Sequence, residues 1–154
     1  MLLTASDLCK VRIDLSSVAG APVAGELLWA EALGDDLYRL RNIPGFAFGL
    51  SEGDVVRCTL REGVNTVTSL VHDSGNGVVR VYFRGPSTSD RERVCVALRR
   101  FGCTHEVGRH ALDFFTVPAS SIGHLHEIAR ILNEEDAVEA WEIGKEPTRP
   151  QVDS

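Results

Sequence analysis

Residues 78–118, VVRVYFRGPSTSDRERVCVALRRFGCTHEVGRHALDFFTVP, decide the fold because their apolar spacing changes from that of a strand to that of a helix and back. The run 78–84 is typical of a strand. Apolar residues then recur at helical spacing, as Val94, Ala97, Leu98 and Phe101. Gly102 stands where a glycine caps the C-terminus of a helix. Segments 103–109 and 110–118 read as two strands joined by a turn.

A second helix and a last strand follow this stretch. Ser120 or Ser121 can cap the helix, whose apolar face is Ile122, Leu125, Ile128, Ala129 and Leu132. Segment 137–144 reads as the closing strand. The order is then strand, helix, strand, strand, helix, strand, which is the βαββαβ order of the ferredoxin-like sandwich, with both helices on one face of an antiparallel sheet. The polar, proline-broken residues 145–154 predict a disordered tail.

The first half of the chain predicts only strands. Its apolar residues alternate at period two, and tight turns separate the segments 10–15, 26–33, 37–43, 55–60 and 64–72. We therefore expect a small antiparallel β-sheet or partial barrel over residues 1–74, packed on the ferredoxin-like half at 75–144. The fold class is α+β. Because neither half is large enough to be comfortable alone, we expect one compact unit.

Composition excludes several classes of protein. The 154 residues are 44% hydrophobic and 25% charged, as in soluble globular proteins, and the net charge of −6 argues against binding to nucleic acid. The chain contains no apolar span of membrane-crossing length, and its N-terminus lacks the basic region of a signal peptide. These features predict a cytoplasmic protein without a membrane partner.

The chemically reactive residues form no recognisable catalytic or metal-binding set. The cysteines have no Cys-x-x-Cys spacing and are expected to be buried free thiols at Cys9, Cys58, Cys95 and Cys103. His124 and His126 would lie about 200° apart on a helix, so they cannot share one ion. The adjacent residues 72–74, His-Asp-Ser, cannot reach the geometry of a hydrolytic triad. We expect no catalytic residues, metal or organic cofactor, and the sequence favours a protein that is not an enzyme.

The stretch 39–58, RLRNIPGFAFGLSEGDVVRC, places two phenylalanines in a conformationally restricted loop. Pro44 fixes its own φ and favours an extended conformation at the preceding residue, while Gly45 and Gly49 permit backbone angles closed to other residues. Phe46 and Phe48 could tuck inward as a structural corner, at the end of the barrel or at its joint with the second half. Alternatively, they could line a binding lip.

The best candidate site is the region where this loop meets the two preceding strands. It comprises Trp29, Glu31, Tyr38, Arg39, Arg41, Asn42, Phe46 and Phe48. Aromatic walls with a few polar groups are the usual makeup of a ligand cleft. Strand alternation puts Trp29 with Glu31 on one face and Arg39 with Arg41 on another, which would keep the eight residues from sharing a single pocket.

Two stretches resemble a known family: LLWAEALGDDLYRLRNIPGFAFGLSEGDVVRC at 27–58 and SGNGVVRV at 74–81. They contain a Trp-x-Glu strand, a Tyr-x-Leu strand, an Asn-Ile-Pro loop with aromatics, Gly-Asp-x-Val, and a Ser-Gly turn before a strand. This pattern is similar to the bacterial domain-of-unknown-function family 4265. The chain departs from it with Gly45 where an aromatic often follows the proline, and with Gly77 and Val78 where a threonine is expected. The resemblance implies a fold and a bacterial origin, and it implies no activity.

Three functional hypotheses remain open. The first is a non-catalytic protein that binds a small molecule or another protein in a regulatory role. The second is an acidic immunity-type protein that neutralises a toxin. The third is a small enzyme that uses Glu31, Tyr38 and the arginines. A homodimer is also a prediction, because exposed sheet edges in ferredoxin-like domains invite pairing.

Overall fold

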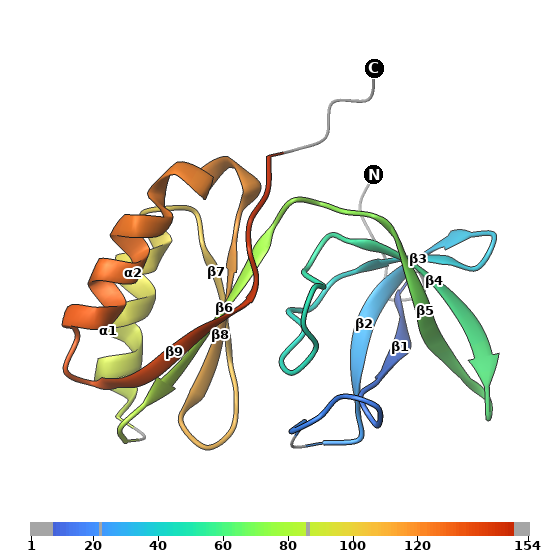
Figure 1. The fold of residues 1–154 in the computed structure, drawn as a ribbon, viewed down its shortest axis with the longest axis horizontal. Helices are drawn as coiled ribbons and strands as arrows, with labels where there is room; N and C mark the ends of the chain where they lie inside the picture. The colour runs from blue at the N-terminus through green and yellow to red at the C-terminus, as the bar shows by residue number, and fades with distance from the viewer. Residues whose placement is uncertain (1–7, 22, 86, 150–154) are drawn as a thin grey trace. The chain divides into compact units, whose positions relative to one another are not determined.

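The computed structural model describes residues 8–21, 23–85 and 87–149, and it divides into two compact units (Figure 1). Unit 1 comprises residues 1–74 and unit 2 comprises residues 75–154. Within residues 8–21 and 23–74, unit 1 contains strands and no helix, whereas unit 2 contains strands and helices. The protein is therefore an α+β protein built mainly from antiparallel sheet.

Unit 1 is a closed barrel of five strands in sequence order. The strands are β1 (Leu8–Asp14), β2 (Gly25–Gly34), β3 (Leu37–Leu40), β4 (Val55–Arg61) and β5 (Val64–His72). Successive strands pair antiparallel, but the barrel closes through a parallel pair of β1 and β5 at Arg12 and Thr66. The expected sheet or partial barrel is thus a full barrel, since this contact pairs the two strands that would otherwise be edges.

Side-chain alternation along β2 builds the core of the barrel. Leu28 and Ala30 are buried, whereas Leu27 and Trp29 are exposed. The same alternation buries Leu40 on β3. The buried cluster is completed by Val11, Ile13, Leu15, Ala47, Val56 and Cys58. The period-two pattern predicts that the two sets of side chains lie on opposite faces, and the structure shows that the face of Leu28 and Ala30 is the inward one.

Unit 2 contains a four-stranded sheet in the order β7-β8-β6-β9, with every neighbouring pair antiparallel. Its elements are β6 (Gly77–Phe83), α1 (Thr88–Arg99), β7 (Thr104–Val107), β8 (Leu112–Val117), the 3₁₀ helix η2 (Ala119–His124), α2 (Leu125–Glu134) and β9 (Val138–Lys145). Both α-helices lie on one side of the sheet (Figure 1). Leu98 of α1 and Ile128 of α2 share a buried cluster with Val79 and Phe115 of the sheet.

Local signals in the sequence explain where α1 begins and ends. The hydroxyl of Ser87 accepts a hydrogen bond from the amide of Asp90 at 3.4 Å, which caps the first turn. Gly102 has a φ of +79°, and its amide donates to the carbonyl of Arg99 at 2.9 Å. This left-handed conformation favours glycine, so Gly102 ends the helix as the sequence predicts.

The second helical segment differs from the prediction at its start. A single α-helix was expected from Ser120 or Ser121, but residues 119–124 form the 3₁₀ helix and α2 begins at Leu125. The hydroxyl of Ser121 donates to the carbonyl of Phe101 instead of capping a helix. Ile122, expected on the buried face, is 37% exposed because the tighter 3₁₀ turn rotates its side chain away from that face.

The C-terminal segment is more ordered than expected. The tail was predicted to begin at Lys145, but β9 extends through this residue, and the amide of Thr148 donates to the carbonyl of Gly75 at 2.8 Å. Pro147 packs over Gly77 so closely that a side chain there would lie 2.7 Å from the proline ring. Backbone pairing and proline packing therefore continue beyond the last strand. The rest of the expected tail, 150–154, lies outside the described residues.

Candidate functional site

A single carboxylate holds the loop that follows β3. Glu26 lies on the inward face of β2 and accepts hydrogen bonds from the amides of Gly45, Phe46 and Ala47, at 2.9, 3.2 and 3.0 Å. Successive amides that point to one centre form an anion-binding concavity, and here the anion is part of the same chain. Glu26 was not among the expected site residues. The sequence could have indicated this role, because alternation along the strand places Glu26 on the same face as the buried Leu28. A carboxylate on a buried face requires hydrogen-bond donors.

The two phenylalanines of the loop have different environments. Phe46 is half-buried against the barrel core, next to the fully packed Ala47. Phe48 is 61% exposed. The structural corner is therefore formed by Phe46, whereas only Phe48 presents an aromatic surface to solvent. Glu26 holds the backbone of the loop through three hydrogen bonds, and the two aromatic side chains contribute unequally to the core.

A second buried carboxylate holds the turn before β4. Asp54 is fully buried and accepts hydrogen bonds from the amide and hydroxyl of Ser51, at 2.9 and 3.1 Å. The amide and hydroxyl of Ser74 also donate to it, at 2.8 and 2.6 Å. Ser74 therefore joins the end of unit 1 to this turn, while the neighbouring His72 is exposed. This arrangement is structural, because the hydrogen bonds of Ser74 to Asp54 hold the turn in place.

The outer face of β2 carries a row of exposed apolar side chains. Leu27, Trp29 and Leu33 are 55%, 44% and 40% exposed. Lys10 of β1 pairs with Trp29 across the sheet, and its ammonium group lies 4.8 Å from the centre of the indole ring. This distance is within the range of a cation–π interaction. The exposed indole is thus held between a cation and the barrel wall.

Basic residues flank this row on both sides. Arg12 of β1 pairs with Leu27, and its guanidinium lies over Gly25, where an added Cβ would approach Nε to 2.9 Å. On the other side, Arg39 of β3 forms an ion pair of 3.4 Å with Glu31, and the exposed Arg41 follows two positions later. We call this surface the β2 face. Its residues are Lys10, Arg12, Leu27, Trp29, Glu31, Leu33, Arg39 and Arg41.

The structure brings together half of the expected site residues and separates the rest. Trp29, Glu31, Arg39 and Arg41 share the β2 face, which corrects the expectation that the two arginines lie on another face. The reason is the register: Glu31 and Arg39 are directly opposite in the antiparallel pair, and opposite residues project from the same side of a sheet.

Three of the remaining expected residues have structural roles, whereas the fourth, Phe48, is exposed and is not one of the residues of the β2 face. Tyr38 packs against the barrel core, and burial raises the pKa of its hydroxyl. The side-chain oxygen of Asn42 accepts a hydrogen bond from the amide of Trp29 at 2.8 Å. Beyond the end of β3, the side chain of Asn42 therefore accepts the hydrogen bond from β2 that a backbone carbonyl would accept within a strand pair. Phe46 belongs to the corner described above.

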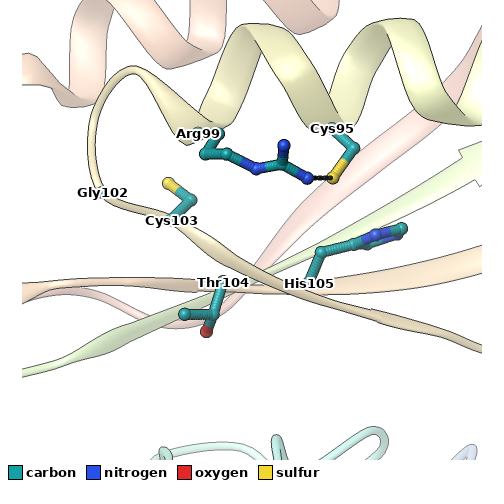
Figure 2. Close-up of a pocket in the computed structure, with 6 residues that line it drawn as sticks. All are labelled: Cys95, Arg99, Gly102, Cys103, Thr104 and His105. Carbon is teal, nitrogen blue, oxygen red and sulfur yellow. Dashed lines mark hydrogen bonds between the residues drawn. The ribbon is translucent and has the colours of Figure 1, made fainter.

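Unit 2 contains a cavity that the sequence did not predict. It has a volume of about 500 Å³ and lies between the end of α1 and the start of β7 (Figure 2). Its lining residues are Cys95, Arg99, Gly102, Cys103, Thr104 and His105. The guanidinium of Arg99 donates a hydrogen bond to the sulfur of Cys95 at 3.4 Å, one helical turn away. Figure 2 shows this contact on the side of α1 that faces the cavity.

Behind the cavity, His105 is oriented by a fully buried carboxylate. Its Nε2 lies 2.8 Å from Oδ2 of Asp113 on β8, and its ring stacks on Phe115 at 4.6 Å. Arg91 of α1 forms an ion pair of 3.2 Å with the other oxygen of Asp113. The arrangement ties helix α1 to two strands and fixes the imidazole ring at the cavity wall.

Within residues 8–21, 23–85 and 87–149, no three His, Cys, Asp or Glu side chains converge in a way that could hold a metal ion. In the same ranges, no helix has the length and apolar character needed to cross a membrane.

Comparison with known proteins identifies a family. A solved structure of a hypothetical protein from Neisseria gonorrhoeae is similar in fold, with a TM-score of 0.70, 18% sequence identity, and coverage of 93% of this chain and 96% of that chain. No curated protein matches the chain. The family model described as a domain of unknown function, DUF4265, matches residues 26–143, which is most of the chain. The resemblance inferred from the sequence is thereby confirmed, and the chain belongs to the DUF4265 family.

Proposed function

We propose that the protein is a non-catalytic binding protein whose β2 face binds an acidic protein partner. The observation that carries this proposal is the exposed row of Leu27, Trp29 and Leu33 between two basic strands. Exposed apolar side chains rimmed by charged residues mark interaction surfaces. Tryptophan is also enriched among the residues that dominate the binding energy of protein interfaces.

The charge of the β2 face defines the partner. Its four basic residues outnumber the acidic Glu31 and the neighbouring Asp14, which lies on the same side of β1 as Lys10 and Arg12, whereas the chain as a whole has a net charge of −6. Complementary charge steers association and selects the partner, so the surface that fits this face is acidic. This differs from the alternative of an acidic immunity-type protein, which would neutralise a basic toxin through its acidic residues.

The position of the face favours a protein over a small molecule. The row lies on the outside of a closed barrel, whereas small-molecule sites are concave. The enzyme hypothesis has less support, because Tyr38 packs toward the barrel core while Glu31 is paired with Arg39 on the outside. The residues on which the enzyme hypothesis depends, Glu31, Tyr38 and the arginines, therefore do not all lie on one surface.

We make three further proposals about the class of protein. The strand order β7-β8-β6-β9, with a helix after β6 and another after β8, supports a ferredoxin-like sandwich for unit 2. The two units act as one compact protein, since each is small for independent stability. A bacterial, cytoplasmic origin is supported by the bacterial source of the similar structure and by four free thiols, which suit a reducing compartment.

The proposal is tested by selecting peptides from a random displayed library on the intact protein. The expected result is enrichment of peptides that combine Asp or Glu with aromatic or aliphatic residues. A synthetic copy of an enriched peptide should bind the Trp29→Ala variant about 30-fold more weakly, because loss of an interface tryptophan typically costs about 2 kcal/mol or more. Reversal of charge by Lys10→Glu and Arg12→Glu should also weaken binding, and more strongly at low salt.

A matched control is Leu60→Ala on β4, because Leu60 is 71% exposed but lies outside the β2 face. This variant should bind the peptide with unchanged affinity. Enriched peptides without acidic residues, or equal binding by the Trp29→Ala variant, would contradict the proposal. Binding of a single-stranded oligonucleotide that Trp29→Ala abolishes would assign the face to nucleic acid instead. Self-association that depends on Trp29 would make the partner a second copy of the chain.

A further inference from the structure

We infer that the part of the partner that contacts the β2 face is an amphipathic α-helix of about 14 residues, with acidic residues on both sides of its apolar stripe. This inference rests on the proposed function and deepens it, because it states which secondary structure the acidic partner presents. Three observations support it: the backbone of β2 is hydrogen-bonded on both sides, the apolar row is long, and basic residues border the row on both sides.

The backbone of β2 is already paired along the apolar row. On one side, β2 pairs with β1 from Gly25 to Glu31. On the other side, the carbonyl of Trp29 accepts a hydrogen bond from the amide of Arg41, and the amide of Trp29 donates to the side chain of Asn42. The residues of β2 that follow pair with β3. A partner segment therefore lies over the side chains of the β2 face and does not extend the sheet at this strand.

This position favours a helix over an extended segment. The aliphatic side chains of Leu27 and Leu33 offer no hydrogen-bond partner to a group that lies over them. An extended segment placed there would remove water from its own backbone N–H and C=O groups without replacing those hydrogen bonds, which is costly. An α-helix pairs these groups within itself and presents only side chains to the row.

The length of the row sets the length of the helix. Leu27 and Leu33 both lie on β2, and the strand between them is about 20 Å long at about 3.3 Å per residue. A helix rises about 1.5 Å per residue, so about 14 residues cover this distance. Trp29 lies between the two leucines, so apolar residues on successive turns of one face of the helix can contact the whole row.

The basic residues on both sides of the row determine the charge pattern of the helix. Lys10 is the cross-strand partner of Trp29 on β1, and Arg41 lies beside Trp29 on the other side. Both basic residues are exposed, whereas Arg39 is already paired with Glu31. A helix with acidic residues on both flanks of its apolar stripe therefore meets a cation on each side.

The first test uses two synthetic peptides of about 14 residues and the full chain. Both peptides have leucines that alternate at helical spacings of three and four residues, with glutamates on both sides of this stripe. In one peptide, a lactam bridge on the opposite surface holds the helix. In the other, a proline replaces a central residue of that surface, which breaks the helix without removing a contact. Calorimetry should show about 100-fold tighter binding of the bridged peptide, and this binding should depend on Trp29.

A second measurement separates the inference from the function on which it rests. An alanine scan of an acidic peptide enriched from the displayed library should show losses of affinity at positions three and four residues apart. If enriched acidic peptides depend on Trp29 but show losses at every second residue, or if the proline peptide binds as tightly as the bridged one, the helix is overturned and the proposed function stands. If neither the library nor the bridged peptide gives binding that depends on Trp29, both are overturned.

Variants at the two ends of the row test the length of the contact. Leu27→Ala and Leu33→Ala should each weaken binding of the bridged peptide about fivefold, whereas the control Leu60→Ala should leave it unchanged. Because all three leucines are exposed, we expect melting temperatures within a few degrees of the parent. Removal of one terminal turn of the peptide should abolish the effect of one of the two β2 variants and retain the other. Sensitivity to only one of them in the complete peptide would overturn the stated length.

Discussion

The two units of this protein bury carboxylates with different kinds of partner. In unit 1, Glu26 and Asp54 accept hydrogen bonds from backbone amides and serine hydroxyls, all of them neutral donors. In unit 2, the fully buried Asp113 lies between two basic side chains, Arg91 and His105. The barrel therefore uses carboxylates to hold loops in shape, whereas the helix-covered sheet uses one to tie a helix to two strands.

This difference predicts different responses to mutation. When a buried neutral donor loses its acceptor, its hydrogen bond is left unsatisfied, and the free energy of unfolding falls by about 1–3 kcal/mol. A buried charge that loses its counter-charge costs more, about 3–5 kcal/mol. Each unit contains one of the two tryptophans of the chain, Trp29 in unit 1 and Trp141 in unit 2, so replacement of either by Phe leaves a fluorescent reporter for the other unit.

The largest effect is expected for Asp113→Ala. The change removes the counter-charge of Arg91 and the hydrogen-bond partner of His105, whose side chains are only 16% and 17% exposed, and should lower the free energy of unfolding by about 3 kcal/mol. Urea denaturation followed by Trp141 in the Trp29→Phe background measures it. Asp113→Asn, which keeps the shape but removes the charge, should fall between the parent and the Ala variant. A loss below about 1 kcal/mol for Asp113→Ala would show that the ionic contacts do not stabilise unit 2.

A smaller effect is expected for Glu26→Ala in unit 1. Three loop amides lose their acceptor, and two of them belong to the buried residues Gly45 and Ala47, so we expect a loss of about 2 kcal/mol. Hydrogen exchange at these amides should accelerate in the same variant. Glu26→Gln retains one acceptor oxygen and should be less affected. Unchanged exchange in Glu26→Ala would mean that the loop keeps its conformation without the carboxylate.

The smallest effect concerns acid pH, where each unit has an exposed carboxyl with a lowered pKa. A hydrogen bond from Arg93 holds the pKa of Glu135 in unit 2 below its ordinary 4.5, and the hydroxyl of Ser16 does the same for Asp14 in unit 1, below 3.8. A lowered folded-state pKa means that the added stability is present above the ordinary value. It is lost as the pH falls through the folded-state value.

Glu135→Gln should therefore reduce the decrease in stability at acid pH that the fluorescence of Trp141 reports. Asp14→Asn should reduce the decrease that the fluorescence of Trp29 reports. High salt should weaken the Glu135 contribution, which depends on an ion pair, but not that of Asp14, whose main partner is a neutral hydroxyl. Urea midpoints measured between neutral pH and pH 3 at two salt concentrations test both statements. Equal salt sensitivity of the two contributions would contradict the distinction between charged and neutral partners.

Much of the fold could be predicted because its signals are local. The alternation in residues 26–33 separated Leu28 and Ala30 from Leu27 and Trp29, and the first pair is buried whereas the second is exposed. Gly102 marked the end of α1 through its left-handed φ of +79°. The closure of the barrel had no such signal, because the parallel contact of Arg12 with Thr66 joins strands that are far apart in the sequence. A pattern within one strand carries no information about its non-local neighbour.

The candidate site was predicted in part for the same reason. Trp29 and Glu31 were correctly placed on one face, since alternation along a single strand decides this. Their juxtaposition with Arg39 depends on the register between β2 and β3, which a bulge between Ala32 and Gly34 shifts. A slip of one residue would have turned the arginine to the other face. The register therefore decided the composition of the β2 face.

The sequence by itself determined the strand and helix order, the division of side chains between the two faces of a strand, and the family. These properties depend on the backbone conformations and side-chain periods of neighbouring residues. The tertiary structure alone decided the barrel closure, the capture of the loop amides by Glu26, and the contact of Asp113 with His105. Each of these joins groups from different elements. Their contact depends on how the elements pack, and a polar group that packing buries must find its partner wherever the fold provides one.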